Sequence, residues 1–78
     1  MNIEIAIKNA CKKLKENKIS SPLLDSELLL SKVIKKDRKF ILLNPDKELN
    51  QIDQKNFKDL IIRRSKGKPL AYLTGSKS

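Results

Sequence analysis

The chain has 78 residues, of which 38% are hydrophobic and 35% charged, and its formal net charge is +9. This length allows one small domain with a limited hydrophobic core, and the composition is typical of a globular domain with a heavily charged surface. A transmembrane segment is excluded, because no apolar stretch approaches the roughly 20 residues that one needs.

The first residues, MNIEIAIKNACKK, contain an acid at Glu4 and no basic region before the apolar residues. A signal peptide has the opposite arrangement, so we expect a cytoplasmic protein with no membrane partner. Cys11 is the only cysteine, so no internal disulfide is expected. It falls in step with Ile7 and Leu14, which indicates a small buried hydrophobe; a reactive thiol would need a base or an exposed electropositive setting.

The predicted first helix lies between Ile3 and Lys15, where apolar residues recur at helical spacing. Asn2 is placed to cap its start by accepting backbone N–H groups. Asn17 and Lys18 are expected to end it.

The predicted second helix begins with Ser21 as N-cap and Pro22 at the first helical position, where a missing N–H does no harm. Asp25 lies near the first turn, where a negative charge favours the helix dipole, and Lys35 and Lys36 suit the other end. The apolar face is wide enough to predict burial on more than one side. It consists of Leu24, Leu28, Val33 and Ile34, with Leu23, Leu29 and Leu30 beside them.

The FILL segment at 40–43 is compatible with a short buried strand or a short helix. No other segment alternates in a way that would pair with a strand, so a short helix from about Asp37 is preferred. Asn44 and Pro45 are expected to end it, because the residue before a proline avoids helical geometry.

A further helix is predicted from Asn50, with Asp53 three residues later in a variant of the capping box. Gly67 is the expected left-handed residue after its last turn, with Pro69 just beyond. The expected apolar face consists of Ile52, Phe57, Leu60 and Ile61. Residues 69–73 would add one more short helical turn before Thr74 and Gly75. The fold predicted is therefore all-α, a small bundle of about five helices.

The residues that carry most enzyme chemistry are missing. The chain has no histidine, one cysteine and no clustered carboxylates, which excludes most metal sites and any nucleophile activated by a histidine base. Its two glycines, Gly67 and Gly75, cannot form a Gly-rich phosphate loop and are expected to serve backbone turns. We therefore expect no catalytic, cofactor-binding or metal-binding residue in this chain.

The segment RRSKGKPLAYLTG, at 63–75, resembles the segment that joins the N-terminal domain to the catalytic domain in the HemK (PrmC) family. The matching positions are Arg63, Arg64, Gly67, Pro69, Ala71, Tyr72, Leu73, Thr74 and Gly75. Upstream, SPLLDSELLLSKV resembles the family's second helix, with an Asp-x-Glu followed by leucines, and FILLNPDKEL resembles the next short helix and its loop. The resemblance spans nearly the whole chain.

This family methylates the glutamine of the GGQ motif in peptide-chain release factors, with S-adenosylmethionine as methyl donor. The resemblance implies that residues 1–75 are an N-terminal helical substrate-recognition domain and that 76–78 begin the linker to a catalytic domain. That domain would carry the Gly-rich S-adenosylmethionine loop and an Asn-Pro-Pro-Tyr motif, neither of which is in this sequence. The implied partners of this monomeric domain are the release factor and the protein's own catalytic domain.

Five residues of the motif are candidates for contacts with a partner or with the catalytic domain: Arg63, Arg64, Pro69, Tyr72 and Thr74. The arginines are equally compatible with a solvated helix end that favours the dipole. For Tyr72 the preferred interpretation is a ring packed on the bundle, with its hydroxyl at the surface.

The alternative function is a small basic nucleic-acid-binding module. An excess of 18 basic over 9 acidic side chains indicates an acidic partner. The lysines are spread along the chain, however, and a coding bias toward AT-rich codons would also produce them; the pairs at 12–13 and 35–36 are typical of solvated faces. Aromatic stacking platforms and a recognition helix are lacking, so we expect nucleic-acid binding to be non-specific at most.

Overall fold

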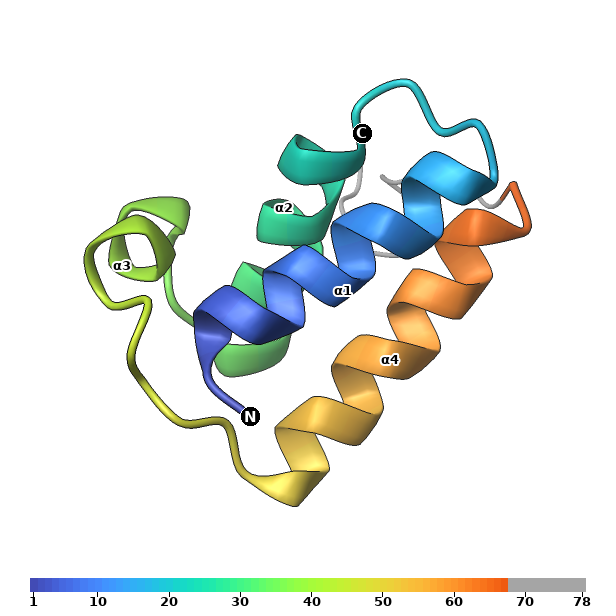
Figure 1. The fold of residues 1–78 in the computed structure, drawn as a ribbon. Helices are drawn as coiled ribbons and strands as arrows, with labels where there is room; N and C mark the ends of the chain where they lie inside the picture. The colour runs from blue at the N-terminus through green and yellow to red at the C-terminus, as the bar shows by residue number, and fades with distance from the viewer. Residues whose placement is uncertain (68–78) are drawn as a thin grey trace, which may run out of the picture.

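The computed structural model describes residues 1–67, which form four helices (Figure 1). These are α1 (Ile3–Glu16), α2 (Pro22–Ile34), α3 (Arg38–Leu43) and α4 (Gln51–Ser65). The all-α prediction is confirmed, and the FILL segment is helical. The described residues hold four helices rather than about five, and the predicted turn at 69–73 lies outside them. Within residues 1–67, none of the helices is long and apolar enough to cross a membrane.

Short-range side-chain interactions fix where three of the helices begin. The side-chain oxygen of Asn2 accepts the N–H of Ile5 at 2.9 Å, Asp37 accepts that of Phe40 at 2.8 Å, and Asn50 accepts that of Asp53 at 2.7 Å. Each bond satisfies one of the N–H groups that a helix start leaves without a partner. The N-terminal end of α2 is set by Pro22 at the first helical position, and Ser21, the N-cap residue, makes no side-chain capping bond.

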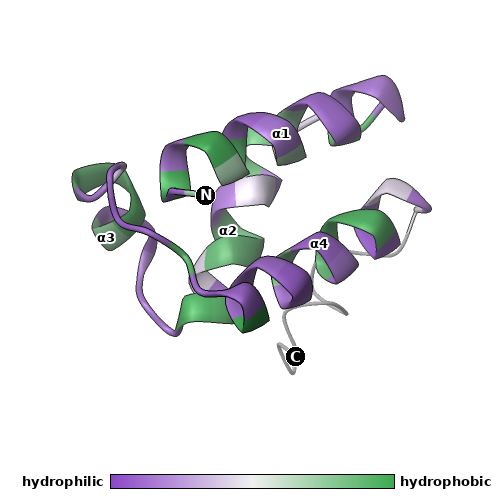
Figure 2. Ribbon diagram, turned by 60° about the horizontal axis from the view of Figure 1, so that its bottom comes forward, coloured by the Kyte–Doolittle hydropathy of each residue, from purple (hydrophilic) through white to green (hydrophobic). Residues whose placement is uncertain are grey.

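Three helices enclose the core, and α3 packs on α2 at one end of the molecule. In Figure 2, α2 lies between α1 and α4, and the outward sides of α1 and α4 are largely hydrophilic. The buried hydrophobic residues come from all four helices and from Leu49: Ile3, Ala6, Ala10 and Leu14 in α1, Leu29 and Leu30 in α2, Ile41 in α3, and Phe57 and Ile61 in α4.

The buried face of α2 differs from the predicted one. Leu23 and Leu24 are 54% and 41% exposed, whereas Ser26 and Glu27 are 0% and 4% exposed. Ile52 of α4, also predicted to face the core, is 71% exposed. Because α2 packs against α1, α3 and α4, the positions of these three neighbours decide which of its residues are covered.

The loop after α3 is tied to the start of α1. The N–H of Ile3 donates to the carbonyl of Lys47 at 2.9 Å, and the N–H of Leu49 donates to the carbonyl of Met1 at 2.9 Å. The terminal ammonium of Met1 also pairs with Glu48 at 3.1 Å. These bonds hold the first residue beside the beginning of α4.

Candidate functional site

The structure places only part of the predicted contact segment. Arg63 and Arg64 lie in the last turn of α4, and Gly67 follows that helix. Pro69, Tyr72, Thr74 and Gly75 lie outside the described residues. The described part of the segment is therefore the C-terminal end of α4.

Arg64 is joined to α2 by an ion pair. Its Nε lies 2.9 Å from Oδ2 of Asp25, and the two side chains are 21% and 6% exposed. A carboxylate as buried as this needs a charged or hydrogen-bonding partner. The pair fixes the last turn of α4 against the first turn of α2, while the neighbouring Arg63 is exposed to solvent.

A second ion pair joins α2 to α3. Oε1 of Glu27 accepts Nε of Arg38 at 2.7 Å, and the Glu27 side chain is 6% exposed. Residues two apart on a helix point to different sides, so Asp25 reaches α4 whereas Glu27 reaches the first residue of α3. Sequence reasoning missed both roles. The available signal was a pair of acids inside a leucine-rich helix, because acids in a buried helix need partners.

Backbone hydrogen bonds cap the C-terminal end of α4. The N–H groups of Lys66 and Gly67 donate to carbonyls of the last turn, including that of Arg64. Gly67 has a φ of +95°, in the left-handed region that favours glycine, and a Cβ there would meet nothing within 4 Å. Backbone geometry, rather than a close neighbour, is the reason for glycine at this position.

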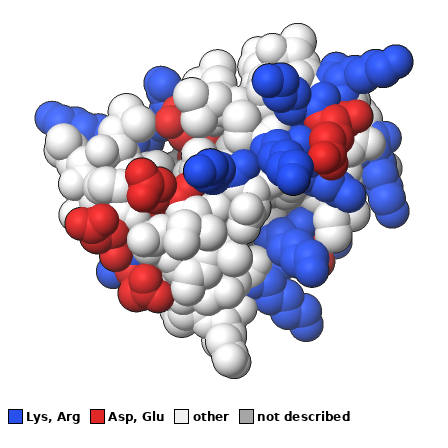
Figure 3. Space-filling model, in the orientation of Figure 1, with Lys and Arg blue, Asp and Glu red and all other residues white. Residues whose placement is uncertain are grey.

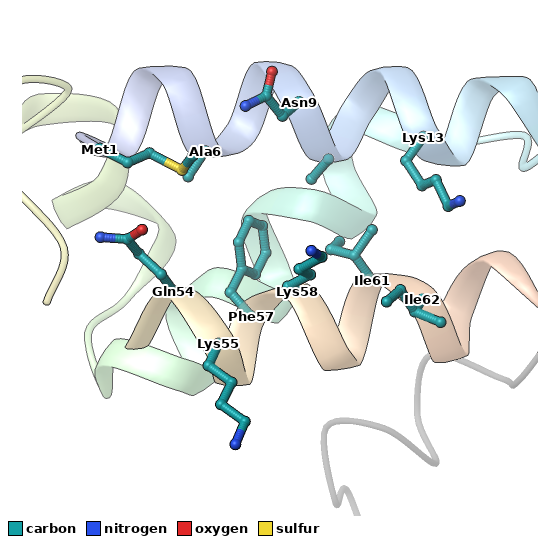
Figure 4. A pocket seen from close by; sticks show the side chains of 11 residues that line it. Met1, Ala6, Asn9, Lys13, Gln54, Lys55, Phe57, Lys58, Ile61 and Ile62 are labelled. Carbon is teal, nitrogen blue, oxygen red and sulfur yellow. The ribbon is translucent and has the colours of Figure 1, made fainter. Parts of the chain in front are cut away.

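A groove of about 660 Å³ lies between α1 and α4, which run side by side (Figure 4). Phe57 and Ile61 of α4 point toward α1, where the facing residues Ala6 and Ala10 have short side chains. The remaining lining residues are Met1, Asn9, Lys13, Gln54, Lys55, Lys58 and Ile62. The two alanines, Phe57 and Ile61 are only 3–5% exposed, so the apolar side chains between the two helices are already covered.

The charged side chains that line this groove are all basic. Three of its lining residues are lysines and none is an acid. In Figure 4, Lys13 extends from α1 toward α4 and Lys58 lies over the gap, whereas Lys55 points away from α1. Figure 3, in the orientation of Figure 1, shows many basic side chains across the surface, several acidic ones at the left and a further acidic group among the basic ones at the upper right. A lining of this kind favours contact with negatively charged groups.

No group of three or more His, Cys, Asp or Glu residues that could hold a metal ion occurs within residues 1–67. Cys11, predicted to be buried, is half-buried. Every buried side-chain nitrogen or oxygen of the described residues has a hydrogen-bond partner.

Comparison with known proteins identifies the family. The sequence model of the PrmC N-terminal domain matches residues 6–75. The chain is 36% identical over 77 residues to a release factor glutamine methyltransferase of Vibrio cholerae, covering 99% of this chain and 27% of that protein. It is 41% identical over 63 residues to the release factor glutamine methyltransferase of Clostridium botulinum, covering 81% and 22%. It is also 38% identical over 76 residues to a bifunctional methyltransferase of Rickettsia conorii, covering 97% and 14%.

No solved structure gives a significant match to the chain. The chain spans about a quarter or less of the length of the relatives named above. The family match, in contrast, covers nearly all of the chain and includes the described end of α4. This chain therefore belongs to the PrmC N-terminal domain family.

Proposed function

We propose that residues 1–75 form the N-terminal domain that recognises the release factor in a glutamine methyltransferase. The enzyme would transfer a methyl group from S-adenosylmethionine to the glutamine of the GGQ motif. The observation that carries this proposal is the family match over residues 6–75, together with relatives that are named release factor glutamine methyltransferases.

In this proposal the fragment recognises substrate, and the methyl transfer occurs in a catalytic domain that begins after the linker at 76–78. S-adenosylmethionine would be bound by that domain, because the Gly-rich loop and the Asn-Pro-Pro-Tyr motif are not in this sequence. The protein would act in the cytoplasm, as a monomer.

Two parts of the chain would make different contacts. Residues 69–75 would dock on the catalytic domain. Tyr72→Ala should therefore lower the activity of the full-length enzyme by a larger fraction than it lowers the stability of this chain. Arg63 is exposed at the end of α4 and is available to a partner or to that domain. Arg64 is anchored to Asp25 at 2.9 Å, which supports a role in fixing the position of the helix end.

The net charge of +9 favours a second candidate, a nucleic-acid-binding module. Such modules stack bases on exposed aromatic rings. Phe57 is 4% exposed, and Phe40 is partly buried with the ammonium of Lys36 at 5.4 Å from its ring centroid. Neither phenylalanine is presented as a stacking platform, so release-factor recognition is the better supported function.

The test is a titration of the chain against release factor, duplex DNA and tRNA at two salt concentrations. We expect a release-factor complex that survives at the higher concentration. Nucleic-acid affinity that depends on several phosphate contacts should fall by about 10³ or more between about 50 and 200 mM salt. A tight, sequence-selective nucleic-acid complex at the higher salt, with no release-factor binding, would reverse the assignment.

A further inference from the structure

The last turn of α4 extends beyond the core of the domain. Ile61 is the last buried residue of this helix, and residues 62–67 are half-buried or exposed. The N–H groups of Lys66 and Gly67 close the helix end by donating to carbonyls of the last turn. These bonds are local, so they give the turn its shape but do not fix its direction relative to the other helices.

The ion pair between Arg64 and Asp25 supplies that direction. Nε of Arg64 lies 2.9 Å from Oδ2 of Asp25, which is 39 positions earlier in the sequence. Asp25 is a firm anchor because it is 4% exposed and is followed by Ser26 and Glu27, which are 0% and 4% exposed. Its helix, α2, packs against α1, α3 and α4. The end of α4 is therefore attached to the helix that contacts all the others.

The chain leaves the described domain at this turn. Gly67, with a φ of +95°, follows α4, and in the proposed function the catalytic domain is attached beyond it. A domain of about 100–200 residues has a radius of gyration of about 13–16 Å, so a tilt of about 10° at its attachment moves a site about 20 Å away by about 3 Å. A misplacement of about 1 Å can lower the rate of a reaction by about 10²-fold. The direction of the last turn of α4 therefore matters for catalysis.

We propose that Asp25 and Arg64 are positioning residues for methyl transfer. Their ion pair fixes the direction in which the chain leaves α4, and thereby where a bound release factor presents its glutamine to the catalytic domain. This proposal rests on the proposed function and adds to it the residues that couple recognition to transfer. Breaking the pair lowers the effective concentration of the glutamine at the active site, because the two parts of the enzyme are no longer held in one arrangement.

Two matched substitutions in α2 test the proposal. Asp25→Ala removes the anchor, and Glu27→Ala is the control. Both carboxylates are 6% exposed and each pairs with one arginine, but Glu27 pairs with Arg38 at 2.7 Å and holds α3 instead of the end of α4. We expect the kcat/KM of the full-length enzyme for release factor to fall at least about tenfold with Asp25→Ala and no more than about threefold with Glu27→Ala. Circular dichroism at the assay temperature checks that both variants are folded.

Two further measurements separate positioning from damage to the fold. A short peptide containing GGQ reaches the catalytic domain without being held by the N-terminal domain, so Asp25→Ala should change its methylation by no more than about twofold. The isolated chain carrying Asp25→Ala should bind release factor with an unchanged Kd, because the pair directs the chain end and does not form the contact. A higher Kd for this chain would place the pair in the binding surface and overturn the positioning role.

Arg64→Lys is a milder second variant, which keeps the proposal testable if Asp25→Ala does not fold. Lysine keeps a positive charge near Asp25 but lacks the planar guanidinium, so it holds the carboxylate in a less defined geometry. We expect a fall in kcat/KM for release factor that is smaller than that of Asp25→Ala, and no change for the short peptide. Unchanged kcat/KM for both substrates in both variants would overturn the proposal.

Other outcomes distinguish this proposal from the proposed function. Equal losses for Asp25→Ala and Glu27→Ala, or equal losses on release factor and on the short peptide, would overturn the positioning role and leave the proposed function intact. Absence of release-factor methylation by the unsubstituted full-length protein would contradict the proposed function.

A distance measurement then decides the positioning role without any activity. One spin label is placed on α1 at Lys8→Cys, where the side chain is exposed, and a second in the domain that follows, with Cys11 replaced by Ser. We expect the distribution of distances between the labels to widen with Asp25→Ala and not with Glu27→Ala. Identical distributions for the two variants would overturn the proposal.

Discussion

The ion pair between Arg64 and Asp25 gives a sharp test of how the end of α4 is held. Arg64→Met removes the charge and keeps a long, flexible apolar side chain. It leaves the Asp25 carboxylate, 6% exposed, without its guanidinium partner. Since burial of an unpaired charge is strongly unfavourable, the variant should lower the free energy of unfolding.

The size of the effect follows from the exposure of the two side chains. Removing one partner of a fully buried pair costs about 3–5 kcal/mol. Arg64 is 21% exposed, so water reaches part of the pair and we expect a loss of about 2–3 kcal/mol. A domain of 78 residues has a total stability of about 4–12 kcal/mol. The single change therefore removes a large fraction of it.

Urea unfolding followed by circular dichroism measures the loss, and Arg63→Met is the matched control. Arg63 is the preceding residue and is exposed, so its replacement should change the stability by no more than about 0.5 kcal/mol. A double-mutant cycle with Asp25→Asn should give a coupling of about 1–2 kcal/mol. Equal losses for the two arginine variants, or a coupling near zero, would refute the argument.

Five further predictions follow from the packing, the charge and the motifs of the chain. Leu30→Ala should lower the free energy of unfolding by about 2–5 kcal/mol because Leu30 is 0% exposed. Leu28→Ala should lower it by less, because Leu28 is only partly buried; similar thermal melts for the two variants would contradict the assigned core. Gly67→Ala should cost about 1 kcal/mol in the same melts, because alanine is strained at a φ of +95°. Any binding to duplex DNA should weaken steeply with salt in a fluorescence titration, and calorimetry with S-adenosylmethionine should show no saturable micromolar site on this chain.

The helices and most of their ends were predictable because local interactions decide them. Asn2 and Asn50 each accept an N–H three residues ahead in the chain, and Pro22 occupies the first position of its helix. An interaction that spans one turn is visible in a short stretch of sequence. The family was also accessible from the sequence, because a motif of nine matching positions lies at 63–75.

The candidate site was predictable only where its residues belong to that motif. Arg63, Arg64 and Gly67 were named from it, and the structure adds what Arg64 does. Its partner Asp25 is 39 positions away in the sequence. No helical spacing rule connects residues so far apart, so the pair appears only when α2 and α4 are placed together.

The sequence by itself determined the helical segments, their ends and the charge of the chain. The tertiary structure decided which residues those helices bury: Leu24 and Ile52 are 41% and 71% exposed, while Glu27 is 4% exposed. It also decided that Lys13 and Lys58, from opposite ends of the chain, line the same groove. Periodicity gives a helix an apolar side, but the angle and distance at which its neighbours cross it determine what is covered, because these depend on every packed side chain at once.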